Sequence, residues 1–158
     1  MESCALDLAG RFRHLRPTKV LTVATTGLIL GIPMARILSV PAVYARKSRS
    51  VVMRDSYHKT YASKSHGSSM EVFVSKGHLS ADDRILVVDD WLSSGACQEA
   101  LLSIISDVGA ETVGVAVLLE KGYESGRTFL SGYDVPIESV VSVRTVSEGT
   151  IDVETGDE

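Results

Sequence analysis

The chain has 158 residues, 44% of them hydrophobic, which fits a single domain with a substantial apolar core. Its formal net charge of −4 provides no basic field for nucleic acid, so we expect no nucleic-acid partner. The two cysteines, Cys4 and Cys97, lie far apart in the chain, which argues against a disulfide framework and favours a reducing, cytoplasmic compartment.

The first third of the chain predicts alternating helices and strands. We expect an amphipathic helix over 4–15, a buried strand over 19–24, a helix over 28–38 and a second strand over 42–46. The first helix would carry on one face the apolar residues Leu6, Leu8, Ala9 and Phe12. Residues 20–35 carry no charge but are fewer than the roughly 20 that span a bilayer, so we expect no membrane segment.

Residues 48–69 differ from the segments around them, because they are polar and rich in Ser, Lys, His and Tyr. A polar segment of this length within a compact domain is typical of a functional or disordered loop. We therefore expect a loop here, followed by a strand over 70–75.

The second half of the chain predicts further strands and one long helix. Buried strands are expected over 85–88, 112–119 and 138–146, a helix over 98–108 and a short hairpin strand over 151–153. Apolar strands that alternate with helices predict an α/β fold, here a single domain over 1–158 with a parallel sheet covered on both faces. The core would cover about 18–150, and the acidic tail, 154–158, would be frayed.

Residues 85–97, ILVVDDWLSSGAC, place two carboxylates and a small-residue turn at the end of a buried strand. A strand that leads through such a turn into a helix forms an anion site, because the first helical N–H groups lack internal partners and carry the positive end of the helix dipole. Asp89 and Asp90 would accept hydrogen bonds from sugar hydroxyls or attract Mg²⁺. The combination therefore indicates a sugar-phosphate site.

Two other interpretations fit parts of this motif. A solvated turn after a core strand would explain the polar residues without a ligand. The receiver domains of signalling proteins also have an apolar strand followed by paired acids, but there the acids lie near the start of the domain. Only residues 91–158 follow Asp90 here, too few for the rest of such a domain.

Three stretches resemble motifs of the type I phosphoribosyltransferases. Residues 85–97 resemble the family's phosphoribosyl-pyrophosphate (PRPP) signature, and 22–47 (TVATTGLILGIPMARILSVPAVYARK) resemble its pyrophosphate loop and basic strand end. Residues 118–127 (LLEKGYESGR) resemble the strand and loop that close the base pocket of xanthine phosphoribosyltransferases. The resemblance implies a Rossmann-like phosphoribosyltransferase fold and a purine-salvage enzyme that transfers ribose 5-phosphate from PRPP to a 6-oxopurine such as xanthine.

The resemblance also implies a role for each motif residue. Asp89 and Asp90 would hold the ribose hydroxyls, and together with Lys47 they are the candidate catalytic residues. The 5′-phosphate would lie in the turn formed by Leu92, Ser93, Ser94, Gly95, Ala96 and Cys97. The pyrophosphate would face Thr25, Thr26, Gly27, Arg46 and Lys47. Trp91 would lie against the base and Lys121 near an exocyclic purine oxygen, while Mg²⁺ would enter with PRPP, with Asp89 and Asp90 as candidate ligands.

Several alternatives stay open beside these roles. The resemblance implies a mobile lid over 50–69, a homodimer and, because little sequence precedes the core, a reduced N-terminal hood over the base. Trp91 would otherwise be a core aromatic residue, Lys121 a solvated charge, and Arg46 with Lys47 an exposed pair. The alternative function is a PRPP-sensing, non-catalytic regulator or binding subunit related to bacterial purine repressors, but residues 118–127 favour the enzyme.

Overall fold

The computed structural model describes residues 1–49, 53, 55–63 and 67–155. Its main sheet has the strand order β2-β1-β5-β6-β7-β8, and β3 and β4 form a separate two-stranded ribbon. Neighbouring strands from β2 to β7 run parallel, while β8 pairs antiparallel with β7. The α/β fold with a parallel sheet is therefore confirmed.

The main sheet consists of β1 (Lys19–Val23), β2 (Ala42–Ala45), β5 (Arg84–Leu92), β6 (Glu111–Lys121), β7 (Ile137–Ser147) and β8 (Thr150–Thr155). The ribbon consists of β3 (Ser56–Ser63) and β4 (Ser68–Ser75). The α-helices are α1 (Glu2–Phe12), α2 (Leu28–Leu38), α3 (Ala96–Val108) and α4 (Gly126–Leu130). Three short 3₁₀ turns are η1 (Arg13–Leu15), η2 (Lys76–His78) and η3 (Ser131–Tyr133).

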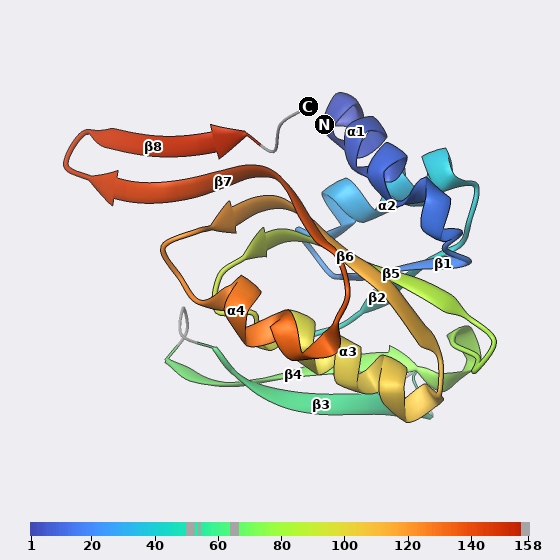
Figure 1. The fold of residues 1–158 in the computed structure, drawn as a ribbon. Helices are drawn as coiled ribbons and strands as arrows, with labels where there is room; N and C mark the ends of the chain where they lie inside the picture. The colour runs from blue at the N-terminus through green and yellow to red at the C-terminus, as the bar shows by residue number, and fades with distance from the viewer. Residues whose placement is uncertain (50–52, 54, 64–66, 156–158) are drawn as a thin grey trace.

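Both faces of the main sheet are covered (Figure 1). Helices α1 and α2 lie on one face, where Phe12 and Met34 pack in one cluster with Leu86 of β5. Helix α3 and the β3–β4 ribbon lie on the other face, where Leu101 packs in a second cluster with Val87. Because successive residues of a strand point to opposite faces, an unbroken apolar strand is required to supply both clusters.

Part of the polar segment 48–69 forms a strand where we predicted a loop. Residues 56–63 form β3, which pairs antiparallel with β4 along its whole length. Tyr57 and Tyr61, on one side of β3, pack against the core beneath α3, and this aromatic alternation supplies the apolar face that a count of aliphatic residues misses. Residues 50–52, 54 and 64–66 of the predicted lid lie outside the described residues.

Other boundaries also differ from the prediction. Helix α2 has the predicted bounds, with Pro33 in its interior, whereas Leu6 of α1 is exposed although we expected it on the buried face. Strand β5 continues to Leu92, so the acid pair lies within the strand and not after it. The short helix α4 was not predicted. No helix in the described part of the chain is long and apolar enough to cross a membrane.

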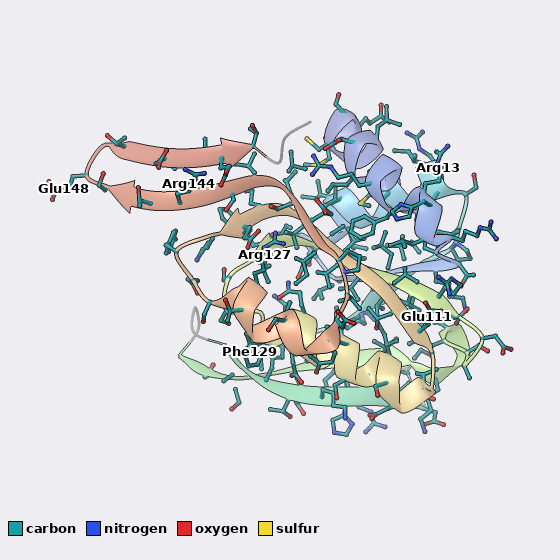
Figure 2. The ribbon with its side chains drawn as sticks, in the orientation of Figure 1. Arg13, Glu111, Arg127, Phe129, Arg144 and Glu148 are labelled. Atoms are coloured by element: carbon teal, nitrogen blue, oxygen red, sulfur yellow. The ribbon has the colours of Figure 1, made fainter. Side chains whose placement is uncertain are left out.

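The antiparallel pair β7–β8 extends away from the body of the molecule as a ribbon, with Glu148 at its tip (Figures 1 and 2). Every residue of β8 is exposed. The short hairpin strand that we predicted near 151–153 is therefore confirmed, and it is longer than expected.

Candidate active site

A cavity of about 520 Å³ lies at the carboxyl ends of the central strands. Val23 ends β1, Asp90 lies near the end of β5 and Lys121 ends β6, and all three residues line the cavity. The start of α3, the turn before α2 and β3 complete its wall. This is the edge at which ligands bind in open parallel sheets.

Most of the residues that we proposed from the sequence come together here. Those that line the cavity are Thr26, Lys47, Asp89, Asp90, Trp91, Ser93, Ser94, Gly95, Ala96, Cys97 and Lys121. Thr25 and Gly27 lie beside Thr26 in the turn before α2 and do not line the cavity. The side chain of Leu92 is fully buried in the core beneath α3, which makes it a packing residue in this structure.

Arg46 lies apart from the cavity. Its backbone N–H and carbonyl pair with Phe73 of β4 at 2.9 and 2.8 Å, and its guanidinium carbon is 5.8 Å from the centre of the Tyr44 ring. Arg46 and Tyr44 line a different cavity together with Lys19. Of the basic pair, Lys47 therefore faces the candidate site, whereas Arg46 faces the edge of the sheet.

Asp89 is buried, and both of its carboxylate oxygens have partners. Oδ1 accepts a hydrogen bond from the backbone N–H of Asp90 at 2.9 Å, and Oδ2 accepts one from Nε2 of Gln98, also at 2.9 Å. Burial raises the pKa of Asp89 well above its usual range, and the neighbouring Asp90 carboxylate adds to the rise. The Asp90 N–H and the charge of Lys47 oppose it. Asp90 itself is half-buried.

Gly27 allows the turn before α2 to approach the acid pair closely. A Cβ atom at this position would lie 2.7 Å from Asp89 Oδ1, 2.6 Å from Thr22 Oγ1 and 2.8 Å from the carbonyl oxygen of Val23. All three distances are shorter than van der Waals contact, so a side chain here would push the turn away from β5. The Thr-Thr-Gly turn and the acid pair therefore depend on a glycine for their spacing.

The start of α3 supplies backbone donors to the same cavity. Gly95 precedes the helix with φ of 82° and provides no side-chain cap, while Ala96 and Cys97 line the cavity. The first N–H groups of a helix have no intrahelical acceptor, and they carry the positive end of the helix dipole. This end of the cavity is therefore suited to a phosphate group.

Trp91 and Lys121 line the same cavity. The Lys121 ammonium lies 5.8 Å from the centre of the Trp91 ring and 3.3 Å from a carboxylate oxygen of Glu124. Trp91 is 39% exposed, so it is not the core aromatic residue that the sequence left as an alternative. An exposed indole face beside a cation provides an apolar platform with one polar end, which suits a flat heterocycle.

Strand β3 contributes Tyr61 to the wall of the cavity. Tyr61 lines the cavity together with Cys97 of the first turn of α3, and its hydroxyl lies close enough to influence the Cys97 thiol. Burial raises the pKa of Cys97 to about 12, the charge of Asp89 adds to the rise, and the Tyr61 hydroxyl opposes it. Burial likewise raises the pKa of Tyr61. Both groups are therefore neutral near pH 7 and act as packing and hydrogen-bonding groups.

Helix α4 supports the small-residue turn from outside. A Cβ atom on Gly126 would lie 2.2 Å from the carbonyl oxygen of Ser93, so the helix touches the turn through a residue without a side chain. Arg127 then fixes α4 to the sheet: it bonds both carboxylate oxygens of Glu120 at 2.9 and 2.6 Å and the carbonyl oxygen of Ile137 at 2.7 Å. Arg127 lies between α4 and the sheet (Figure 2).

Sequence reasoning missed Gln98 and α4, and it did not place Tyr61 at the site. Gln98 carried a usable signal, because it lies on the same helical stripe as the buried residues Leu101 and Leu102, and a polar residue on a buried stripe requires a partner. Tyr61 repeats Tyr57 at a spacing of four residues, which fits one face of a strand. Helix α4 is only five residues long, too short for a periodic pattern.

Comparisons with known proteins agree with this geometry. A family model described as "Phosphoribosyl transferase domain" matches residues 8–150. A xanthine phosphoribosyltransferase of Deinococcus deserti is 39% identical over 150 residues, which covers 94% of this chain and 78% of the relative. One of Listeria monocytogenes is 34% identical over 152 residues, which covers 96% of this chain and 79% of the relative.

Solved structures show the same fold. Adenine phosphoribosyltransferase from Giardia lamblia, complexed with 9-deazaadenine, superposes with a TM-score of 0.84 at 23% identity and covers 90% of this chain and 79% of its own. The enzyme from Rhodothermus marinus superposes with a TM-score of 0.79 at 26% identity and covers 88% and 77%. The family model, the two relatives and the shared fold together establish that the chain belongs to the phosphoribosyltransferase family.

Proposed function

We propose that the protein transfers ribose 5-phosphate from PRPP to a 6-oxopurine such as xanthine and releases pyrophosphate. As a phosphoribosyltransferase, the chain is a PRPP-dependent glycosyltransferase. One observation carries the proposal: a single cavity joins the acid pair, the uncapped start of α3 and the Trp91–Lys121 pair. Relatives named xanthine phosphoribosyltransferase support the choice of base.

The ribose 5-phosphate half of PRPP would occupy the part of the cavity between β5 and α3. The 5′-phosphate would accept hydrogen bonds from the first N–H groups of α3 and from the hydroxyls of Ser93 and Ser94. The acid pair would accept from the ribose hydroxyls. A carboxylate would repel a bare phosphate. The acid pair and the start of α3 would therefore bind different groups of one sugar-phosphate ligand, the sugar and the phosphate.

The pyrophosphate half would lie toward Thr26 and Lys47. A purine nitrogen attacks C1 of the ribose, the bond from C1 to the pyrophosphate oxygen breaks, and the purine nitrogen loses its proton. The sugar becomes cation-like in the transition state while negative charge grows on the leaving group. The Lys47 ammonium would stabilise this growing charge, and no protein nucleophile is needed.

Mg²⁺ would enter this site with PRPP. Among the residues that the structure describes, no group of three or more His, Cys, Asp or Glu side chains could hold a metal ion. The acid pair therefore fits a partial site, in which PRPP and water would supply most of the oxygen ligands. When bound, the ion would neutralise charge on the pyrophosphate.

The purine would lie against Trp91, with its exocyclic oxygen toward Lys121. A cation next to the oxygen favours an oxo group over an amino group, because an amino group is itself a donor. This arrangement supports a 6-oxopurine over adenine.

Cys4 and Cys97 are free thiols, which supports the proposed cytoplasmic location.

The direct test is pyrophosphate release from PRPP and Mg²⁺ with xanthine, guanine, hypoxanthine or adenine. We expect turnover of at least one 6-oxopurine and slower turnover of adenine. Replacing both acids, Asp89→Asn with Asp90→Asn, should abolish PRPP binding. The control is Asp82→Asn, an exposed carboxylate away from the cavity, which should behave like wild type.

Three results would separate the alternatives. Turnover of adenine alone would overturn the choice of base. Saturable binding of PRPP without turnover of any base would favour the non-catalytic regulator, a function that the comparisons above do not support. PRPP binding that survives replacement of both acids would place the sugar-phosphate site elsewhere.

A further inference from the structure

The β3–β4 ribbon brings the hydroxyl of Tyr61 to the start of α3. Strand β3 lies alongside α3, and the Lys59 ammonium is 2.8 Å from a carboxylate oxygen of Asp107 near the end of that helix (Figure 1). Tyr61, two residues further along β3, lines the cavity together with the small-residue turn, 93–97. The ribbon is therefore held against α3, and Tyr61 lies where we propose that the 5′-phosphate binds.

The Tyr61 ring is held by packing, while its hydroxyl has only a weak neighbour. The ring packs against the core beneath α3, as the ring of Tyr57 does. The hydroxyl lies close to the Cys97 thiol, and each of the two groups influences the pKa of the other. Because a thiol is a weak donor and a weak acceptor, a stronger acceptor would displace it from the phenol.

The Tyr61 hydroxyl carries its proton at neutral pH. Burial raises the pKa of this phenol above its usual value, and the nearby Cys97 and Asp89 add to the rise. A neutral hydroxyl donates a hydrogen bond to an anion, whereas a phenolate would repel it. The phosphate dianion is a strong acceptor, and a hydrogen bond to a charged group is about twice as strong as one between neutral groups.

We propose that Tyr61 is a further substrate-binding residue, whose hydroxyl donates a hydrogen bond to the 5′-phosphate of PRPP at the start of α3. The inference rests on the proposed function, because it adds one ligand to the phosphate site proposed there. The other donors of that site, the first N–H groups of α3 and the hydroxyls of Ser93 and Ser94, belong to one segment of the chain. Through the phosphate, Tyr61 joins this segment to the separate β3–β4 ribbon.

The variant Tyr61→Phe tests the inference, because it removes the hydroxyl and keeps the ring that packs beneath α3. Trp91 is the one tryptophan of the chain and lines the cavity, so its fluorescence reports binding without turnover. The probe is ribose 5-phosphate, which carries the 5′-phosphate without the pyrophosphate or the base. We expect Tyr61→Phe to weaken its binding about tenfold or more, the effect of one hydrogen bond to a charged group. In steady-state kinetics, KM for PRPP should rise while KM for the purine changes less than about twofold.

Two control variants separate direct contact with the phosphate from an effect on packing. Tyr57→Phe makes the same change four residues earlier on the same face of β3, at a residue that packs against the core and does not line the cavity. It should bind ribose 5-phosphate like wild type. Cys97→Ala removes the thiol beside Tyr61 and keeps the phenol, so it should weaken binding less than about twofold.

Phosphorus NMR of bound ribose 5-phosphate supplies a readout that a packing effect would not move. A hydrogen bond donated to the dianion favours it over the monoanion, and therefore lowers the second pKa of the bound phosphate. Loss of the Tyr61 hydroxyl should raise this pKa, measured by titration at saturating ligand. Tyr57→Phe and Cys97→Ala should leave it unchanged.

The outcomes distinguish this inference from the proposed function. The inference alone would be overturned if Tyr61→Phe bound ribose 5-phosphate as tightly as wild type or left the pKa of the bound phosphate unchanged. Equal losses in Cys97→Ala and Tyr61→Phe would overturn it too, since the contact between the two side chains would then carry the effect. A loss confined to Tyr61→Phe, in a protein that converts no purine, would support the inference and overturn the transfer reaction. Failure of the wild-type protein to bind PRPP would overturn both.

Discussion

Gly27 is the residue whose size most directly limits the site. In Gly27→Ala the new methyl group would overlap Asp89 Oδ1 and Thr22 Oγ1, so the turn before α2 must move. We expect a loss of about 1–3 kcal/mol in the free energy of unfolding, as for other overpacked positions. PRPP affinity should fall at least about tenfold, which corresponds to about 1.4 kcal/mol of binding free energy. Urea unfolding and titration of Trp91 fluorescence measure the two effects.

Gly10→Ala is the control for this variant. Gly10 lies within α1, and a Cβ there would have no atom within 4 Å. Alanine should stabilise the helix by about 0.5–1 kcal/mol and leave PRPP binding unchanged. If Gly27→Ala bound PRPP as tightly as Gly10→Ala, the close packing of the turn would have no role in the site.

Asp89 makes the stability of the protein depend on pH. Its pKa in the folded protein lies above the usual 3.8, so the folded state holds this proton more tightly than the unfolded chain does. The carboxyl group therefore lowers the free energy of unfolding as pH rises from about that value through the raised pKa. We expect Asp89→Asn to flatten this fall, measured by urea unfolding from pH 4 to pH 7.

The exposed carboxylate of Asp82 provides the comparison, and Asp82→Asn should keep the wild-type slope. A wild-type slope in Asp89→Asn as well would show that the buried acid is not the source of the pH dependence.

Glu124 should affect recognition of the base through Lys121. The 3.3 Å ion pair holds the ammonium near the Trp91 ring, and a partly exposed pair contributes up to about 1 kcal/mol. Glu124→Gln should therefore raise KM for a 6-oxopurine about two- to fivefold, with KM for PRPP unchanged. Lys121→Ala should raise KM for the 6-oxopurine further. Steady-state kinetics with each substrate varied in turn would show whether the two effects separate.

At the scale of elements, α4 depends on one ion pair. Arg127→Met would leave Glu120, which is 6% exposed, without its cation. A buried charge that loses its partner is costly, so we expect the free energy of unfolding to fall by about 2–3 kcal/mol. KM for PRPP should rise too, because α4 supports the carbonyl of Ser93. Urea unfolding and steady-state kinetics measure these changes.

Arg144 provides a matched control on the exposed β7–β8 ribbon (Figure 2). It pairs with Glu154, and both side chains are more than half exposed. Because water screens such an exposed pair, Arg144→Met should leave the urea unfolding midpoint and the kinetics close to those of wild type. If Arg127→Met and Arg144→Met lowered the free energy of unfolding equally, burial of Glu120 would not set the strength of its ion pair.

At the scale of the whole molecule, we predict a homodimer. Helix α2 exposes Ile29 and Ile32 on one face, and Tyr44 of the neighbouring β2 is also exposed. Exposed apolar side chains that gather in this way are typical of a protein contact. Light scattering should give about twice the chain mass of 17.0 kDa, and Ile32→Glu should lower it. A mass of one chain at all concentrations would contradict the prediction.

The order of elements was readable from the sequence because it depends on local patterns. Unbroken apolar runs predicted the central strands, and the apolar stripe of residues 98–108 predicted α3. Residues 85–97 also indicated a sugar-phosphate site, since the chemistry of adjacent acids and a small-residue turn lies within one short segment. The sheet was then expected to bring the ends of its strands together.

Only the tertiary structure decided which of these groups face one another. Four contacts illustrate this: β3 pairs with β4, Arg46 turns toward Tyr44, Gln98 bonds Asp89, and α4 contacts Ser93. Each joins segments that are distant or differently oriented. Periodicity describes which side of its own element a residue occupies. It carries no information on the partner across a gap, because that partner is set by packing of the whole chain.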